Sequence, residues 1–188
     1  MLSPTKKAGA GVHQLNAMLQ AALNPASPSK REMVYGSTVF RTGDKVMHIR
    51  NNYQLPWHAD NGEEGEGVFN GDVGFITQVD TEDRVVTVRY DEERTVEYDY
   101  QQLEELELAY CLSVHKSQGS EFPCVVMPVV GGPPRLLTRN LFYTALTRAR
   151  KLVVLVGKED AIAAMVRNNH IAARYTTLTQ RLREELGG

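Results

Sequence analysis

The chain has 188 residues, of which 42% are hydrophobic, so it can bury a core and hold one domain or two small ones. Its formal net charge of −2 at pH 7 excludes a uniformly basic nucleic-acid-binding protein, so any such binding must come from local clusters of basic residues. No apolar run approaches the roughly 18 residues of a membrane span.

The first 24 residues predict a strand, a turn and a helix. Residues 1–5 resemble the end of a strand, and residues 6–11 form a basic, glycine-rich turn. Apolar residues then recur at helical spacing until Asn24-Pro25 ends the helix. The expected apolar stripe consists of Val12, Leu15, Met18, Leu19, Ala22 and Leu23.

After a Pro- and Ser-rich segment at residues 24–30, the hydrophobic period changes from 3.6 to 2. Strand-like segments lie near residues 39–40, 45–50, 73–79, 85–90 and 95–100, with turns between them. In the last hairpin, Val86, Val88 and Tyr90 lie on one face of the first strand. In the same way, Val96, Tyr98 and Tyr100 lie on one face of the second strand. Five short strands predict a small barrel.

Residues 51–67 are long, polar and acidic, with Glu63, Glu64 and Glu66 beside three glycines. This composition predicts a mobile loop between the second and third strands.

Beyond residue 107 the pattern becomes that of an α/β sheet. Residues 108–114 and 125–130 are near-continuous apolar runs, typical of parallel strands buried on both faces. A helical pattern at 138–150 and another apolar run at 152–156 continue the alternation, and 158–168 and 175–186 are expected closing helices. The barrel is then an insertion in an α/β domain. Cys111 and Cys124 lie in the apolar runs, where we expect buried, reduced thiols and a cytoplasmic protein.

The polar segment 114–121 follows the first of these runs. A turn between a strand and a helix exposes backbone N–H groups at the helix start, which suits a phosphate oxygen. The side chains of residues 115–118 add donors that can hold a nucleic-acid backbone without reading its sequence. A polar loop with a helix N-cap at Ser117 or Ser120 explains the same residues, so spacing alone leaves both interpretations open.

In the predicted helix 138–150, one arginine departs from the polar face. The apolar stripe comprises Leu137, Leu141, Phe142, Ala145, Leu146 and Ala149. Arg148 follows Leu141 by seven residues, which places its stem along the edge of that stripe. It either extends over the edge of the core, near the helix C-terminus, or points into a cleft against an anion.

These two segments resemble known motifs. Residues 113–122, Ser-Val-His-Lys-Ser-Gln-Gly-Ser-Glu-Phe, are similar without gaps to motif V of UvrD-type superfamily 1 helicases. Residues 141–149 resemble motif VI, in which a tyrosine is followed after four residues by an arginine. The resemblance is closer to the RecD-like branch, also known as the exodeoxyribonuclease V alpha subunit family. Residues 1–24, 43–47, 51–53 and 68–74 resemble that branch as well, so the likeness covers nearly the whole chain.

The resemblance implies an α/β fold: a RecA-like (P-loop NTPase-type) parallel-sheet domain with an inserted small SH3-like β-barrel. Residues 1–33 and 104–188 would form the second RecA-like helicase domain, called 2A. Residues 34–103 would form the barrel, called 2B.

The resemblance also implies roles for individual residues. Arg148 matches the motif VI arginine that reaches across the interdomain cleft to the γ-phosphate of ATP and stabilises charge in phosphoryl transfer. Gly119 and Glu121 match positions near the ribose and phosphates of ATP. The implied DNA-binding residues are His115, Lys116, Ser117, Gln118, Asn51 and Asn52. Gln118 stands where the UvrD-type pattern has lysine, although glutamine fits the RecD-like form. No metal ligand is implied.

No G-x-x-x-x-G-K-[ST] phosphate loop exists in the chain. Residues 86–94 imitate a Walker B strand, but strand alternation resumes at once, so we interpret them as a hairpin turn. We therefore expect the C-terminal portion of an ATP-dependent, 5′-to-3′ DNA helicase of recombination and repair, inactive alone. ATP and Mg²⁺ would act in the full-length parent. The expected partners are single-stranded DNA, the missing N-terminal RecA-like domain and subunits of a nuclease-helicase complex, with no membrane.

An alternative is a non-catalytic adaptor whose barrel binds nucleic acid or protein. Such a barrel needs an aromatic groove on its surface, and the candidates are Trp57, Tyr53, Tyr98 and Tyr100. Packing of these rings in the barrel core and hairpins is the competing interpretation.

Overall fold

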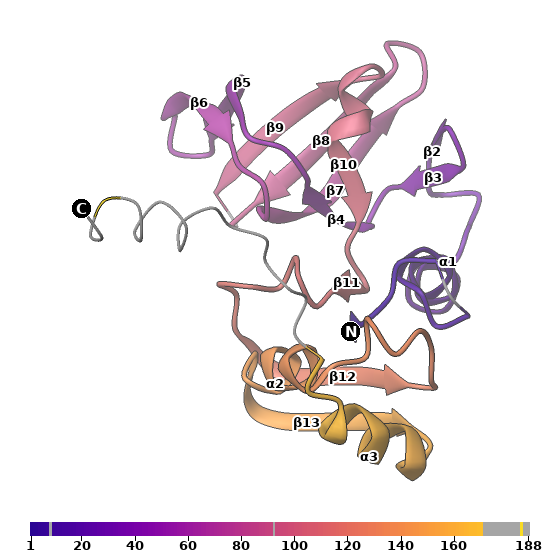
Figure 1. The fold of residues 1–188 in the computed structure, drawn as a ribbon. Helices are drawn as coiled ribbons and strands as arrows, with labels where there is room; N and C mark the ends of the chain where they lie inside the picture. The colour runs from indigo at the N-terminus through magenta and orange to yellow at the C-terminus, as the bar shows by residue number, and fades with distance from the viewer. Residues whose placement is uncertain (8, 92, 171–184, 186–188) are drawn as a thin grey trace.

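The computed structural model describes residues 1–7, 9–91, 93–170 and 185. Figure 1 shows a β-rich part above a smaller α/β part, with helix α1 (Val12–Leu23) beside the junction between them. The predicted helix at 175–186 lies outside the described residues, apart from Glu185. No helix among the described residues is long and apolar enough to cross a membrane.

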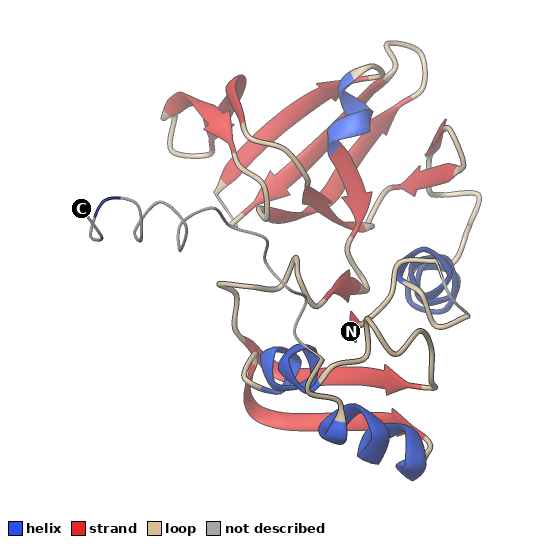
Figure 2. Cartoon of the chain, in the orientation of Figure 1, coloured by secondary structure: helices blue, strands red, loops and turns tan. Residues whose placement is uncertain are grey.

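The α/β part contains two pairs of parallel strands. β1 (Leu2–Ser3) pairs with β11 (Leu112–Ser113), and β12 (Phe122–Val129) pairs with β13 (Ala149–Gly157). Helices α2 (Arg139–Leu146) and α3 (Glu159–Arg167) pack on one face of β12 and β13, as Figure 2 shows. The main side chains of this core are Leu2, Val114, Val125, Met127, Val129, Leu141, Phe142, Ala145 and Met165.

Two details of this part differ from expectation. The run at 108–114 is not one strand, because β10 (Leu106–Leu108) joins the barrel and only Leu112–Ser113 pairs with β1. Cys124 is exposed, whereas Cys111 is buried as predicted and burial raises the pKa of its thiol to about 11. Cys124 is opposite Leu152, on the face of β12 and β13 that α2 and α3 do not cover, where Leu152, Val154 and Val156 are also exposed.

The barrel is built from a seven-stranded sheet in the order β10-β4-β7-β8-β9-β5-β6. Its strands are β4 (Lys45–His48), β5 (Asn52–Ala59), β6 (Glu64–Val68), β7 (Val73–Asp80), β8 (Val85–Tyr90), β9 (Arg94–Asp99) and β10, preceded by the 3₁₀ turn η1 (Gln102–Glu105). The predicted inward residues of the last hairpin are buried, namely Val86, Val88, Tyr90, Val96 and Tyr98, with Tyr100 partly buried. A separate hairpin of β2 (Glu32–Tyr35) and β3 (Thr38–Arg41) precedes the sheet.

The expected mobile loop at 51–67 is wrong, because these residues form the β5–β6 hairpin. The turn is closed by Ala59, whose N–H donates to the carbonyl of Glu63 (2.8 Å), while the N–H of Glu63 donates to Asn61 Oδ1 (2.9 Å). Gly62 has φ of +86°, a left-handed conformation that favours glycine. Asn61-Gly62 is itself a strong hairpin signal, which the acidic composition of the segment obscured.

Helix α1 forms as predicted, but beyond Val12 the stripe that it buries is polar. Asn16, Gln20 and Asn24 are buried, whereas Met18 and Leu23 are 60% and 68% exposed. Each buried amide is satisfied by the surrounding chain: Asn16 Nδ2, for example, donates to the carbonyls of Leu108 (2.8 Å) and Cys111 (3.0 Å). A buried amide with such partners avoids the desolvation cost that would otherwise exclude it from a core.

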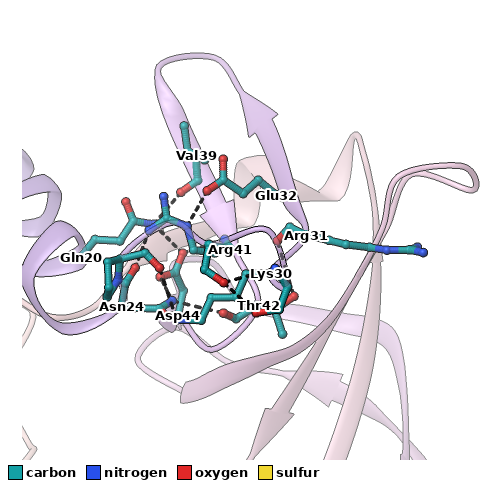
Figure 3. Close-up of polar contacts among 12 residues, drawn as sticks. Gln20, Asn24, Lys30, Arg31, Glu32, Val39, Arg41, Thr42 and Asp44 are labelled. Atoms are coloured by element: carbon teal, nitrogen blue, oxygen red, sulfur yellow. Dashed lines mark hydrogen bonds and ion pairs between the residues drawn. The ribbon is translucent and has the colours of Figure 1, made fainter.

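The deepest of these polar contacts converge on one carboxylate, that of Asp44, which is fully buried (Figure 3). Its Oδ2 accepts from Gln20 Nε2 (2.6 Å) and from the N–H of Arg41 (2.7 Å). Its Oδ1 accepts from Asn24 Nδ2 (2.8 Å) and from the hydroxyl of Tyr110 (2.9 Å). We call these five residues the Asp44 cluster. It joins α1, the β3–β4 turn and the segment that leaves β10.

A second buried polar chain lies inside the barrel. The hydroxyls of Tyr90 and Tyr98 are 2.7 Å apart, and that of Tyr98 lies 3.0 Å from His48 Nδ1. His48 Nε2 has no hydrogen-bond partner among the described residues and lies 3.5 Å from Glu105 Oε2. Burial lowers the pKa of His48, although the negative charges of Glu105 and Asp72 oppose that shift.

Protonation of His48 should destabilise the fold. Because its folded pKa lies below the ordinary 6.5, the unfolded chain takes up the proton first as pH falls. The free energy of unfolding should therefore fall as pH decreases from about 6.5 through the folded pKa, by at most about 1.4 kcal/mol per pH unit from this residue. Urea unfolding between pH 7.5 and about 5 measures this slope. His48→Gln should flatten it, and an unchanged slope would contradict the assignment.

Candidate functional site

A basic cavity lies where the chain leaves β1 and β11. These two strands run parallel with Ser3 opposite Ser113, so the segments that follow them emerge at the same edge. The cavity has a volume of about 580 Å³, and its basic lining residues are Lys6, Lys7, His115 and Lys116. The carboxyl edge of parallel strands is the usual ligand position in open α/β sheets.

The turn after β1 is fixed by a buried serine. Ser3 is fully buried, and its hydroxyl lies 2.6 Å from the carbonyl of Ala10 and 3.0 Å from that of Thr5. The N–H of Val12 also donates to the carbonyl of Thr5 (3.0 Å), which starts α1 directly after the turn. Lys6 and Lys7 are left exposed on this turn. They were absent from the predicted site, although two lysines in a glycine-rich turn after a strand were a usable signal.

The turn after β11, residues 114–121, does not begin a helix, so the predicted strand-to-helix connection is wrong. β12 starts at Phe122, and the turn is closed within itself. The hydroxyl of Ser117 donates to the carbonyl of Val114 (2.8 Å), and the N–H of Lys116 donates to Ser113 Oγ (3.3 Å). Gly119 has φ of +86°, which reverses the chain towards β12.

The predicted DNA-contacting residues fall into three groups. His115 and Gln118 are exposed on the turn, and Lys116 beside them forms an ion pair with Glu107 (Nζ to Oε2 2.7 Å). Ser117 is fully buried, with its hydroxyl used inside the turn.

Asn51 and Asn52 lie elsewhere, at the start of β5. Asn52 Nδ2 donates to Glu105 Oε2 (3.0 Å), and Asn51 Oδ1 accepts from the N–H of Asn70 (3.0 Å). Neither lines the basic cavity, so the structure does not bring them together with the turn residues.

Arg148 lies at the other end of the same turn, and it is not on a helix. α2 ends at Leu146 with Thr147 as its C-cap, because the carbonyl of Arg148 must accept the N–H of Phe122 (2.8 Å) as β13 begins. The guanidinium is held only by neutral oxygens: the carbonyls of Ser120 (3.2 Å) and Thr144 (3.3 Å) and the hydroxyl of Thr147 (3.3 Å). It pairs with no carboxylate among the described residues, so its charge is available for an anion.

Glu121, the residue after Ser120, instead pairs with Arg150 (Oε2 to Nε 2.6 Å) at an exposed position. The structure therefore brings Gly119, Glu121 and Arg148 to one end of the 114–121 turn, and His115 and Lys116 to the other, with Gln118 exposed between them. Within the described residues no three His, Cys, Asp or Glu side chains are grouped so that they could hold a metal ion.

The aromatic candidates of the adaptor alternative are only partly at the surface. Tyr98 is fully buried, so its inclusion in a surface groove was wrong. Tyr100 packs edge-on against Tyr35, with a centroid distance of 5.2 Å, and Tyr53 is 68% exposed and packs against Phe69. Trp57 is half-buried on β5.

Two family models match the chain in the same order as its parts. The ATP-dependent RecD-like DNA helicase SH3 domain matches residues 15–90, and the UvrD-like helicase C-terminal domain matches residues 108–156. Solved structures of Bacteroides Pif1 have the same fold: the complex with single-stranded DNA gives a TM-score of 0.58 at 21% identity over 99% of this chain and 45% of that one. The fold is that of a superfamily 1 helicase domain, RecA-like with an SH3-like barrel.

Similar curated proteins show which family within this class the chain belongs to. The chain is 36% identical over 185 residues to the ATP-dependent RecD2 DNA helicase of Deinococcus radiodurans, and 31% identical over 183 residues to the RecBCD enzyme subunit RecD of Mycolicibacterium smegmatis. These matches cover 97% of this chain but only 23% and 29% of the two relatives. The chain belongs to the RecD-like helicase family and spans about a quarter of the length of these relatives.

Proposed function

We propose that this chain is the C-terminal portion of an ATP-dependent, 5′-to-3′ DNA helicase that acts in recombination and repair. The 2A domain would comprise residues 1–33 and 104–188, and the 2B barrel residues 34–103, although β10 (Leu106–Leu108), beyond that boundary, adds a strand to the barrel sheet. The proposal rests on one observation above all: Arg148, which has no carboxylate partner among the described residues, and a basic cavity stand at opposite ends of the eight-residue turn 114–121.

In this proposal Arg148 reaches the γ-phosphate of ATP held by the other RecA-like domain, and Gly119 and Glu121 lie near the nucleotide. The Arg150–Glu121 pair would have to open or tilt for Glu121 to reach the ribose, and an exposed ion pair of this kind costs little to break. ATP and Mg²⁺ act in the complete parent, and we assign this chain no site that holds either alone. Among the solved structures of this fold, one is a Pif1 complex with ADP-AlF3 and single-stranded DNA.

Single-stranded DNA would follow the cavity, with phosphates near Lys6, Lys7, His115 and Lys116. Backbone contacts of this kind position a strand without reading its bases. The Glu107 partner of Lys116 keeps that ammonium in place before a phosphate arrives. None of the remaining predicted contacts lines the cavity, and they are carried by the family resemblance alone: Ser117, Gln118, Asn51 and Asn52. Partner subunits of a nuclease-helicase complex, and a cytoplasmic location, are part of the same proposal.

Hydrolysis of ATP tests the assignment. The chain alone should show no DNA-stimulated ATPase, and mixing it with the N-terminal RecA-like portion of its parent should restore that activity. Strong ATPase from the chain alone would exclude the proposal.

Replacing Lys6 and Lys7 should reduce the salt dependence of DNA binding. Removing one lysine–phosphate interaction lowers the slope of log K against log salt by about 0.7 for single strands. In the parent, Lys6→Ala/Lys7→Ala should therefore lower the slope by about 1.4, measured by anisotropy of a labelled oligothymidylate over a salt series. Lys151→Ala/Lys158→Ala removes two exposed lysines outside the cavity and is the matched control. Equal slopes for the two variants would remove these lysines from the DNA path.

The alternative, a barrel that acts as an adaptor, is favoured by the exposed Tyr53–Phe69 pair. Its ring centroids are 5.6 Å apart and its planes nearly perpendicular, and exposed rings can stack on bases. The adaptor alternative would be supported if the chain shows salt-sensitive binding of single-stranded DNA that is kept in Lys6→Ala/Lys7→Ala and lost in Tyr53→Ala.

A further inference from the structure

The basic cavity has an apolar wall in addition to its basic residues. Besides the lysines and His115, its lining includes Pro4, Pro133 and Leu136. The last two belong to the segment 130–138 between β12 and α2, which passes beside the turn after β1 (Figure 1). Three segments that are distant in the sequence therefore line one cavity. Two of them carry the basic residues, and the third contributes only apolar ones.

Leu136 is held at this wall by the local fold. The N–H groups of Leu136 (2.9 Å) and Leu137 (3.3 Å) both donate to the carbonyl of Pro133, which closes a turn. Leu137 is buried in the α/β core, whereas Leu136 is 46% exposed and lines the cavity. Asn168, the C-cap of α3, fastens the turn, because its Nδ2 donates to the carbonyls of Pro134 (2.6 Å) and Leu137 (2.9 Å). The position of Leu136 is therefore fixed before a ligand arrives.

The basic cavity suits a ligand with two kinds of surface. Its basic residues suit an anion, and none of its described lining residues is acidic. A phosphate placed against Leu136 and Pro133 would lose hydration without gaining a hydrogen bond, which costs free energy. The face of a nucleobase loses little hydration there and gains contact, and leucine and proline are side chains that proteins place against base faces. A nucleotide unit carries both surfaces.

The size of the cavity agrees with such a unit. Its volume of about 580 Å³ lies within the range of roughly 300–1,000 Å³ that small-molecule sites have, so a base can enter together with its sugar and phosphate. An apolar peptide would fill the wall but would bring no charged partner for the ammonium groups of Lys6 and Lys7. The combination of charge and apolar surface therefore favours a nucleotide over an apolar peptide.

We propose that one base of the bound single strand enters the basic cavity and packs its face against Leu136 and Pro133, while its flanking phosphates lie near Lys6, Lys7 and Lys116. This inference rests on the proposed DNA path. It adds a contact to a base, where that path has contacts to the backbone only. Because every base has an apolar face, the contact accepts any sequence.

An abasic oligonucleotide separates the base contact from the phosphate contacts, because it keeps the phosphates of an oligothymidylate of equal length and lacks the bases. In the complete parent, Leu136→Ala should weaken oligothymidylate binding by about tenfold and leave binding of the abasic strand unchanged. Both dissociation constants are measured by fluorescence anisotropy without ATP. Equal weakening for the two ligands, or no weakening for either, would overturn the proposal.

Two further variants distinguish the base contact from the DNA path itself. Leu23→Ala removes an exposed leucine outside the cavity and should change neither dissociation constant. Lys6→Ala/Lys7→Ala should weaken both ligands alike, since both carry the same phosphates. If the lysine variant binds both ligands as the parent does, the cavity is not on the DNA path, and the path and the base contact fail together. If it weakens both while Leu136→Ala weakens neither, the base contact alone fails.

Leu136→Phe tests whether the wall acts through contact with a base. An aromatic ring offers a larger face for stacking, so oligothymidylate should bind at least as tightly as to the parent, with abasic binding unchanged. Urea unfolding should be the same for the parent and both Leu136 variants, because this side chain is exposed and lies outside the α/β core. If Leu136→Phe weakens oligothymidylate binding as much as Leu136→Ala does, the shape of the turn matters rather than contact with a base, which would exclude the proposed contact.

Discussion

Replacing Arg148 should reduce ATP hydrolysis by the complete parent helicase by about 10³- to 10⁵-fold, the effect of losing an arginine that stabilises charge in phosphoryl transfer. The structure supports a large effect because the guanidinium contacts only neutral oxygens, those of Ser120, Thr144 and Thr147. No described carboxylate has to be displaced before it reaches a phosphate. Both Arg148→Ala and Arg148→Lys should show the loss, since lysine keeps the charge but not the planar fork of donors.

The measurement is steady-state ATPase with saturating single-stranded DNA. A residue that acts in the transition state lowers kcat more than it changes KM for ATP. Arg167→Lys, at an exposed position at the end of α3, is the control and should leave the rate unchanged. If the kcat of an Arg148 variant stays within about tenfold of the parent value, the role of Arg148 is structural: its hydrogen bond to the carbonyl of Ser120 stabilises the turn.

Removing the carboxylate of Asp44 should lower the free energy of unfolding by about 3–5 kcal/mol, which is a large part of the stability of a typical domain. Four donors converge on this buried group, from Gln20, Asn24, Arg41 and Tyr110. Asp44→Ala removes one acceptor from each of the four donors, although the amides of Gln20 and Asn24 keep a second one, the carbonyls of Val39 and Thr42. Asp44→Asn keeps one acceptor oxygen but turns an N–H₂ group towards the remaining donors, so it should also be strongly destabilising.

Urea unfolding measures the loss, with Asp83→Asn as the control at an exposed turn, where we expect a change within about 0.5 kcal/mol. Tyr110→Phe removes one donor and should cost about 1.5–3 kcal/mol, as expected for a hydrogen bond to a charged group. The double variant Asp44→Asn/Tyr110→Phe should cost less than the sum of the two, because both changes remove the same bond. Additive costs would show that Tyr110 and Asp44 act independently.

The sequence predicted best where one signal decides the structure. Strict alternation placed Val86, Val88 and Tyr90 inward on β8, and helical spacing with Asn24-Pro25 gave both ends of α1. It failed where tertiary contacts override such signals. The buried face of α1 is polar because backbone carbonyls from distant segments satisfy Asn16 and Gln20, and a hydrophobic pattern contains no information about those partners.

The sequence likewise predicted only part of the candidate site. The two motifs predicted residues 113–122 and 141–149 as the site segments, and the structure places Gly119 and Glu121, which flank Ser120, beside Arg148. The local geometry was wrong, because a helical period was extended through Arg148 when the pairing of Phe122 with Ala149 ends the helix earlier. Their roles with ATP and DNA stay predictions. Lys6 and Lys7 enter the site only because β1 and β11 are neighbours, a pairing between residues more than a hundred positions apart.

The Asp44 cluster has a consequence for how the barrel is attached. Asn24, where the chain departs towards the barrel, and Tyr110, where it returns, bind the same oxygen of Asp44. The entry and exit of the inserted segment are therefore neighbours in space. When the two ends of an insertion are neighbours, the inserted domain can be removed as a unit and a short linker can join the ends. The barrel could therefore be exchanged between relatives without changing the strand connections of the α/β part.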